Sequence, residues 1–163
     1  MEYSLKKNNT VYSARREKMV ELIKQAHPEK DGLLLLFGGF EHERIPFRQE
    51  SSFYYFTGLN EPGVVFTSDM SAVATLYVPN CVVERAKWVA YDALFENKNA
   101  ATFGFNAIEP LGAKLRGYQL HPFADQAVYE RLVIAIKNAL SAKKSIFTLN
   151  PASPGGYMEQ RLI

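Results

Sequence analysis

Three adjacent residues with metal-ligating side chains, Glu41, His42 and Glu43, form the densest group of reactive side chains in the sequence. Carboxylates and imidazoles can together bind a divalent ion that activates water. Neighbouring residues point to opposite faces of a strand, or about 100° apart on a helix, so these three do not converge on one ion. His27 and His121 each precede a proline in other segments. A surface loop is therefore favoured, and a hydrolytic site built from Glu41, His42 and Glu43 is the weakest alternative.

The other reactive groups lack the partners that their chemistry needs. Cys81 has no nearby base, which favours a small buried apolar side chain over a nucleophile. Ser51 and Ser52 stand outside any Gly-x-Ser-x-Gly context, which argues against a hydrolase elbow. Gly38 and Gly39 are followed by neither a glycine-rich phosphate loop nor its lysine. The residues alone therefore predict no catalytic residue and no metal ligand in this chain.

The segment from Phe47 to Gly63, FRQESSFYYFTGLNEPG, combines many aromatic side chains with polar ones that need hydrogen-bond partners if they are buried. Two turn signals follow the aromatic run, at Thr57-Gly58 and at Glu61-Pro62-Gly63. Gly58 and Gly63 are predicted to adopt positive φ, with Pro62 setting the first corner of a turn. Composition alone is typical of a core segment followed by turns, and the order of the residues is more specific.

This order closely resembles the signature of the N-terminal domain of Xaa-Pro aminopeptidases (aminopeptidase P) and Xaa-Pro dipeptidases (prolidases), in the creatinase-aminopeptidase family. The matching positions are Phe47, Arg48, Gln49, Phe53, Tyr55, Phe56, Thr57, Gly58, Glu61 and Pro62. The strand-like run from Thr75 to Pro79 ends in a Val-Pro step that is also similar to the family, and Trp88 follows it at the family's tryptophan position. The likeness covers roughly Tyr12 to Leu149.

The resemblance implies an α/β fold over residues 1–163, a single domain with a mixed sheet of about five or six strands flanked by helices. It also implies that catalysis belongs to a separate C-terminal domain of the pita-bread fold. In that domain two Asp, one His and two Glu hold a pair of manganese or other divalent ions. None of those ligands can be placed on this sequence, so the chain alone is expected to be inactive and to hold no cofactor.

In this family the N-terminal domain shapes access to the active site and packs subunits together, so the resemblance implies a homodimer or homotetramer acting on peptides. Trp88 is the candidate for substrate access, because indole stacks well on a proline ring; packing within the domain is the alternative. Val89-Ala90-Tyr91 departs from the glycine that many relatives carry there. Arg48 is expected to bind loop carbonyls or a carboxylate such as Glu50 or Glu61, with substrate contact as the alternative. Arg48→Ala should then lower the melting temperature.

The leading hypothesis is the N-terminal, non-catalytic domain of an Xaa-Pro metallo-aminopeptidase, which removes the N-terminal residue from peptides with proline second. The N-terminal domain of an Xaa-Pro dipeptidase suits the same residues. A stand-alone peptide- or protein-binding module is the alternative from another class. The partners expected for the leading hypothesis are the chain's own C-terminal catalytic domain, further copies of the protein and a peptide substrate.

The composition is typical of one globular domain. The 163 residues are 47% hydrophobic and 22% charged, and the formal charge of +2 is too small to favour nucleic acid or a membrane surface. The apolar run Leu33 to Phe37 is far shorter than the roughly 20 residues that span a bilayer. The positively charged start lacks the apolar core of a signal peptide, and Cys81 is the only cysteine, so a cytoplasmic protein is expected.

Hydrophobic periodicity predicts the elements that must position these residues. A helix over 11–26, with Asn9 or Thr10 as its N-cap, buries an apolar face opposite Arg15, Arg16, Lys18 and Glu21. That apolar face consists of Tyr12, Met19, Leu22, Ile23 and Ala26. A helix from an Asp125 cap to Ala142 buries Val128, Leu132, Ala135, Ile136, Ala139 and Leu140, widened by Val133 and Ile134. The remaining predicted elements are a doubly buried strand over 33–37, a helix over 51–57, a hairpin of 64–67 and 74–78 around Ser68-Asp69, a helical turn over 100–103, and strands over 107–111 and 145–149.

Overall fold

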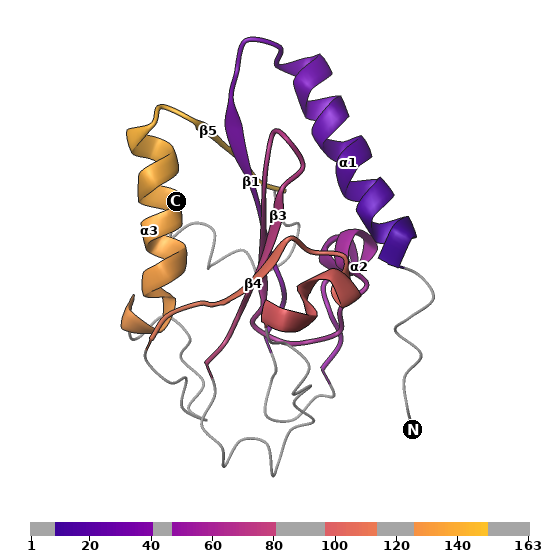
Figure 1. Cartoon of the computed structure of the whole chain (residues 1–163), viewed down its shortest axis with the longest axis vertical. Helices are drawn as coiled ribbons and strands as arrows, with labels where there is room; N and C mark the ends of the chain where they lie inside the picture. The colour runs from indigo at the N-terminus through magenta and orange to yellow at the C-terminus, as the bar shows by residue number, and fades with distance from the viewer. Residues whose placement is uncertain (1–8, 41–46, 81–96, 114–125, 150–163) are drawn as a thin grey trace.

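The computed structural model describes residues 9–40, 47–80, 97–113 and 126–149 (Figure 1). Trp88, Cys81, Asp125 and the Glu41-His42-Glu43 group lie outside the described residues. The strands are β1 (Gly32–Phe37), β2 (Val65–Asp69), β3 (Ala74–Val78), β4 (Ala107–Pro110) and β5 (Ser145–Phe147). The helices are α1 (Asn9–Ala26), α2 (Ser51–Thr57) and α3 (Glu130–Ser141), with 3₁₀ turns η3 (Asn97–Phe103) and η4 (Gln126–Tyr129).

The five strands form one mixed sheet in the order β4-β3-β2-β1-β5. The β1–β2 and β2–β3 pairs are antiparallel, whereas β5 runs parallel to β1 and β4 parallel to β3. The register places Leu36, Phe66, Leu76 and Ile108 side by side across four strands. All four are buried in one cluster, so this row forms the floor of the core on one face of the sheet.

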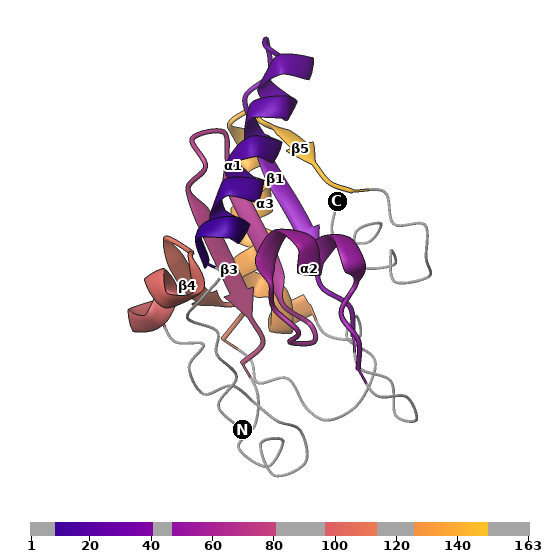
Figure 2. The same ribbon diagram turned by 90° about the vertical axis from the view of Figure 1, so that its right-hand side faces the viewer.

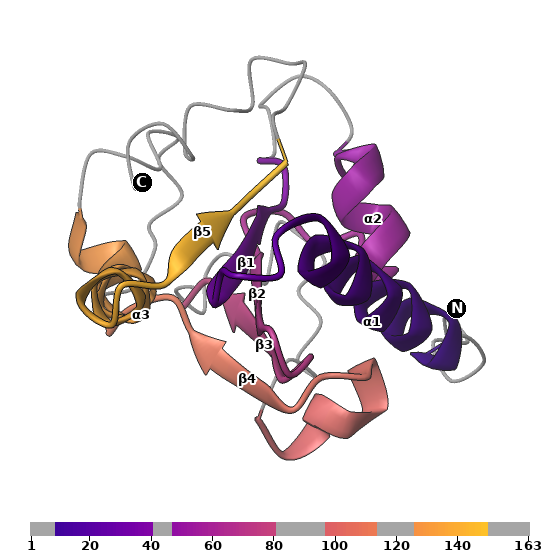
Figure 3. The same ribbon diagram turned by 90° about the horizontal axis from the view of Figure 1, so that it is seen from above.

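Helices cover both faces of the sheet, as predicted (Figure 3). On β1, Leu34 and Leu36 face the cluster that includes residues of α1 and α2, whereas Leu35 and Phe37 face the cluster that includes α3. Successive strand residues point to opposite faces, so a continuous apolar run can fill both cores. Figure 2 shows α1 and α2 lying together in front of the sheet, with α3 behind it. The predicted α/β class with a covered, mixed sheet is confirmed.

The predicted β2–β3 hairpin is confirmed, but its turn lies further along the chain than Ser68-Asp69. Asp69 still belongs to β2, because its N–H donates to the carbonyl of Val73 across the hairpin. Its carboxylate accepts hydrogen bonds from the N–H groups of Ser71 and Val73, at 2.8 and 2.9 Å. Ala72 completes the turn with φ of 62°. The Asp69 carboxylate thus stabilises the turn after the strand has ended, as aspartates commonly do.

The face of the sheet covered by α3 follows the predicted apolar stripe with two exceptions. Leu132 and Ile136 are 0% and 2% exposed, and Val128 and Ala139 are also buried. Leu140 is 49% exposed, because it lies about 100° round the helix from Ala139 and points away from the sheet. Ile134 is likewise half exposed. The α-helix begins at Glu130, after the 3₁₀ turn over Gln126–Tyr129, and not directly after position 125.

The face covered by α1 differs more from the prediction. The helix begins at Asn9, so Asn9 and Thr10 lie in its first turn and are not its caps. Leu22 is 53% exposed, although it was assigned to the apolar face. Arg16, which was assigned to the solvent face, is 3% exposed. Tyr12, Arg16, Met19 and Ile23 follow the i, i+4, i+7, i+11 spacing of one helix face, which explains why the arginine points inward.

The remaining short elements match the sequence closely. The helix predicted over 51–57 is α2, and the helical turn over 100–103 falls within η3. The strands predicted over 107–111 and 145–149 are β4 and β5, each shorter at its C-terminal end. No helix in the described ranges is both long enough and apolar enough to cross a bilayer.

Candidate functional site

The buried amide of Gln49 joins three segments of the signature region. Gln49 is 6% exposed, and its Oε1 accepts hydrogen bonds from the N–H groups of Gly39 and Glu50, at 2.7 and 2.9 Å. Its Nε2 donates to the carbonyl of Glu61 at 2.8 Å, and its backbone N–H donates to Asn60 Oδ1 at 3.1 Å. One neutral side chain therefore connects the end of β1, the start of α2 and the turn after α2.

Local capping explains why an aromatic, β-prone sequence forms the helix α2. The Glu50 carboxylate accepts a hydrogen bond from the N–H of Phe53 at 2.7 Å, which caps the N-terminus. Gly58 ends the helix in the left-handed conformation, φ 69°, and donates to the carbonyl of Tyr54 at 2.7 Å. A side chain at position 58 would also collide with the Tyr12 ring. These contacts fix both ends of α2.

The second predicted turn glycine behaves in the same way. Gly63 has φ of 70°, and its N–H donates to the carbonyl of Gly39 at 2.8 Å. Pro62 is buried beside it. The positive φ predicted for Gly58 and Gly63 is therefore confirmed, and the turn after α2 is held against the end of β1.

Arg16 is the charged counterpart of Gln49 on the same face of the sheet. Its guanidinium donates to the carbonyl of Phe56 at 2.9 Å, to Ser13 Oγ at 3.2 Å and to the carbonyl of Gly104. Those two carbonyls belong to the end of α2 and to the link between η3 and β4. Arg16 therefore ties α1 to two elements that are far from it in the sequence.

Arg16 keeps its charge while it is buried. The guanidinium carbon lies 4.6 Å from the centre of the Phe105 ring and 5.7 Å from that of Phe66, within the range of cation–π attraction. Desolvation by burial lowers the pKa of Arg16 to about 10, against a smaller raising effect from Glu17. The group is consequently cationic at neutral pH. None of the described carboxylates forms an ion pair with it.

The neighbouring Arg15 forms an exposed aromatic cluster instead. Its guanidinium donates to the carbonyl of Tyr55 at 2.9 Å and lies 4.1 Å from the centre of the Tyr55 ring and 5.4 Å from that of Tyr12. Tyr54 and Tyr55 are 46% and 51% exposed. Burial raises the pKa of the Tyr12 hydroxyl, and the contact with Tyr54 raises it further. Consecutive arginines of α1 thus serve different purposes, one inside the core and one on the surface.

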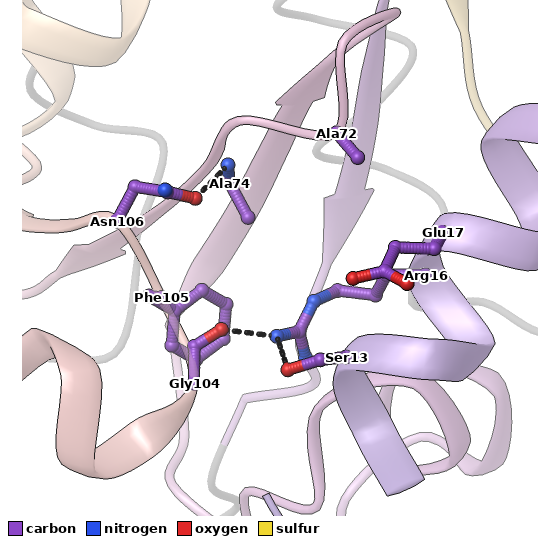
Figure 4. Close-up of a pocket in the computed structure, with 8 residues that line it drawn as sticks. All are labelled: Ser13, Arg16, Glu17, Ala72, Ala74, Gly104, Phe105 and Asn106. Atoms are coloured by element: carbon purple, nitrogen blue, oxygen red, sulfur yellow. Dashed lines mark hydrogen bonds between the residues drawn. The ribbon is translucent and has the colours of Figure 1, made fainter. Parts of the chain in front are cut away.

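A pocket of about 220 Å³ opens beside Arg16 (Figure 4). It lies between α1, the β2–β3 turn and the link from η3 to β4. Its lining residues are Ser13, Arg16, Glu17, Ala72, Ala74, Gly104, Phe105 and Asn106. Asn106 Oδ1 accepts a hydrogen bond from the N–H of Ala74 at 2.7 Å, which closes the strand side of the pocket. Figure 4 shows the guanidinium entering from α1 with Ser13 and Gly104 beside it.

The residues of the predicted signature fall into two groups. Gln49 and Phe53 are buried, and Gly58, Glu61 and Pro62 form the turn around them. Phe47 is half-buried, and the Tyr55 side chain is exposed. Arg48 is also exposed and makes no hydrogen bond or ion pair with another described residue, whereas Gln49 joins three segments of this region. Its effect on stability stays a prediction, as does the role of Trp88.

Neither the inward position of Arg16 nor the pocket that it lines is predicted from the sequence. A signal was available, because Arg16 lies between Tyr12 and Met19 on the helical stripe that ends at Ile23. No three side chains among His, Cys, Asp and Glu come together within the described ranges in a way that could hold a metal ion.

The comparisons with known proteins agree with the fold. The family model of the aminopeptidase P N-terminal domain matches residues 12–114, which is most of the chain. The chain therefore belongs to the family of aminopeptidase P N-terminal domains. It is 37% identical over 78 residues to a probable Xaa-Pro aminopeptidase, pepP, of Botryotinia fuckeliana. It is 40% identical over 65 residues to a probable Xaa-Pro aminopeptidase of Aspergillus flavus.

Solved structures with this fold are only distantly similar in sequence. Icp55 from Saccharomyces cerevisiae superposes with a TM-score of 0.64 at 18% identity, over 98% of this chain and 34% of that one. A variant of Escherichia coli aminopeptidase P in complex with substrate superposes with a TM-score of 0.55 at 18% identity, over 86% of this chain and 36% of that one. The matched parts span only 17% and 13% of the two fungal relatives, and 44% and 36% of this chain.

Proposed function

We propose that this chain is the N-terminal, non-catalytic domain of an Xaa-Pro metallo-aminopeptidase, which releases the N-terminal residue from peptides with proline second. The supporting observation is the match of the aminopeptidase P N-terminal domain model to residues 12–114. The fungal relatives at 37% and 40% identity are described as probable Xaa-Pro aminopeptidases, which favours an aminopeptidase over an Xaa-Pro dipeptidase.

In this proposal the chain shapes the entrance to the active site and packs subunits in a cytoplasmic homo-oligomer. Trp88 is the candidate side chain at the entrance, where its indole would stack on the proline of the substrate. Two manganese or other divalent ions would be held by a C-terminal catalytic domain.

The test starts from the native protein in its own cells. An antibody raised against this chain should detect a polypeptide well above 18.4 kDa, the mass of the chain itself. The captured protein should cleave Ala-Pro-Gly after alanine and leave Ala-Ala-Gly intact. A chelator should abolish the cleavage, and added manganese should restore it. The purified chain alone should cleave neither peptide.

The same assay separates the alternatives. Cleavage of the dipeptide Ala-Pro, without cleavage of Ala-Pro-Gly, would identify an Xaa-Pro dipeptidase instead. A native band at 18.4 kDa with no cleavage of either peptide would identify a stand-alone binding module and would reject the aminopeptidase proposal.

A further inference from the structure

The pocket beside Arg16 combines a buried positive charge with a negative charge at its edge. Arg16 and Glu17 are adjacent on α1, and both line the pocket. Arg16 is 3% exposed, whereas Glu17 is exposed. Figure 4 shows the two side chains next to each other, with Asn106 and Ala74 across the pocket from them. A ligand in this space would meet opposite charges at two neighbouring points.

The Arg16 guanidinium, which lines the pocket, retains unused N–H donors. Its hydrogen bonds to Phe56, Ser13 and Gly104 all use the two Nη atoms, and its Nε–H donates to no described acceptor. An arginine has five N–H donors, so these three bonds leave part of the fork unused. Its acceptors here are carbonyl and hydroxyl oxygens, and its charge is not matched by an ion pair with any described carboxylate. A carboxylate is the group whose charge and geometry best complement such a fork.

The other lining groups restrict the ligand further. Asn106 uses its Oδ1 to accept from Ala74, so its amide N–H groups remain as donors for a carboxylate. Glu17 forms no ion pair with a described residue and is placed to accept from an ammonium group. Phe105, Ala72 and Ala74 contribute the smaller, apolar part of the lining, where a small aliphatic group could pack. A volume of about 220 Å³ suits a molecule smaller than a typical drug-sized ligand.

We propose that this pocket binds a free α-amino acid, with the carboxylate at Arg16 and Asn106 and the ammonium group at Glu17. A simple anion would be repelled by Glu17, and a simple cation by Arg16, whereas a zwitterion complements both. The site is argued from its own side chains. Only the choice of an amino acid over other zwitterions rests on the proposed function, because an aminopeptidase releases a free amino acid at each turnover.

Titration of the purified chain with L-alanine, followed by NMR chemical shifts of the amides around the pocket, tests the proposal. We expect saturable shifts at Ala72, Gly104 and Asn106. N-acetyl-L-alanine, which lacks the ammonium group, and L-alaninamide, which lacks the carboxylate, should each bind at least about tenfold more weakly. That factor corresponds to one charge-assisted hydrogen bond.

Glu17→Gln is the informative variant, because Glu17 is exposed and its replacement should leave the fold intact. It should weaken alanine binding by about tenfold, the value of one charge-assisted contact. Glu21→Gln, one helical turn further along α1 and outside the pocket, is the matched control and should bind alanine as the wild type does. Amide spectra of both variants report whether the fold is retained.

Three results would overturn the proposal: no shifts at the solubility limit of alanine, binding of either blocked ligand as tight as that of alanine, or unchanged alanine binding by Glu17→Gln. Tight binding of inorganic phosphate that strengthens in Glu17→Gln would also reject it and would indicate a plain anion site. The assay needs no catalysis. Alanine binding by a chain whose native protein cleaves no Xaa-Pro peptide would keep this inference and reject only the proposed function.

Discussion

The two faces of the sheet are covered in different ways. Under α3 the contacts are largely aliphatic, with Leu132 and Ile136 packed against Leu35 and Val65. Under α1 the only fully buried apolar side chain of the helix is Val20, and the central contact is the Arg16 guanidinium. Apolar packing depends on area and shape, whereas the Arg16 contacts depend on the positions of individual oxygen atoms.

This difference shows that two helices on opposite faces of one sheet can be attached by unlike forces. The α3 cover tolerates small shifts, because dispersion and hydrophobic burial are not directional. The position of α1 on the sheet is fixed by hydrogen bonds from Arg16 to the end of α2 and to the link before β4. The face that carries the Phe47–Gly63 signature is therefore the face where polar groups determine the arrangement.

The largest effect is expected from Arg16→Ala. It removes three hydrogen bonds from a charged donor and leaves the partly buried carbonyls of Phe56 and Gly104 without that donor. We expect a loss of about 3 to 4 kcal/mol in the free energy of unfolding, measured by urea denaturation. Arg15→Ala, at the adjacent and less buried position, should cost no more than about 1 kcal/mol, because its hydrogen bond and ring contact lie near the surface. Equal losses for the two variants would show that the α1 cover does not depend on Arg16.

Leu132→Ala should cost about 3 kcal/mol, because a fully buried leucine is truncated and a cavity remains under α3. Leu140→Ala is the matched control on the same helix. Leu140 is 49% exposed, so its truncation should change the free energy of unfolding by less than about 1 kcal/mol. Urea denaturation again supplies the measurement, and a large loss for Leu140→Ala would mean that this residue is covered in solution.

Gln49→Ala should cost about 2 kcal/mol. The substitution removes the hydrogen bonds of the Gln49 side chain to the Gly39 N–H and to the Glu61 carbonyl, and this junction is largely buried. The exposed Gln25 of α1 offers the control, since Gln25→Ala should be close to neutral. Thermal denaturation of both variants tests this prediction. An unchanged melting temperature for Gln49→Ala would show that the amide junction does not stabilise this face.

The smallest effect concerns pH and the α3 face. Burial raises the pKa of the Tyr77 hydroxyl, with Glu109 adding to the effect and Thr67 opposing it. The unfolded chain then loses this proton at a lower pH than the folded protein does. The contribution of Tyr77 to the free energy of unfolding is therefore fully present below pH 10.0, the ordinary pKa of tyrosine. It is lost as the pH rises through the higher pKa of the folded state. Urea denaturation just below and just above pH 10 should show a smaller decrease in the free energy of unfolding for Tyr77→Phe than for the wild type.

Much of the fold could be predicted from local patterns. The run Leu33 to Phe37 predicted a doubly buried strand, because an unbroken apolar stretch satisfies both faces of a covered sheet. The helix over 51–57 was predicted despite its β-prone aromatics, and Glu50 and Gly58 supply the caps that favour it. Boundaries were less accurate at the β2–β3 turn and at the start of α3, where side-chain hydrogen bonds and a 3₁₀ turn set the ends.

The candidate site was less predictable. The signature indicated which residues matter, but not that the Gln49 side chain joins three segments of this region. An amide carries both a donor and an acceptor, so it can join N–H groups and a carbonyl within one buried junction, which a guanidinium cannot. The pocket combines residues of three segments, and no spacing along the chain indicates that Glu17 and Asn106 lie on the same cavity.

The sequence by itself determined the strands, the α3 stripe, the positive φ of Gly58 and Gly63, and the family. Each of these depends on neighbouring residues or on the order of a short segment. Only the tertiary structure decided the position of the Arg16 charge. Its backbone acceptors lie 40 and 88 residues away, on Phe56 and Gly104. A helical pattern gives the direction of a side chain, but the carbonyls that make burial of a cation tolerable are brought to it by the rest of the fold.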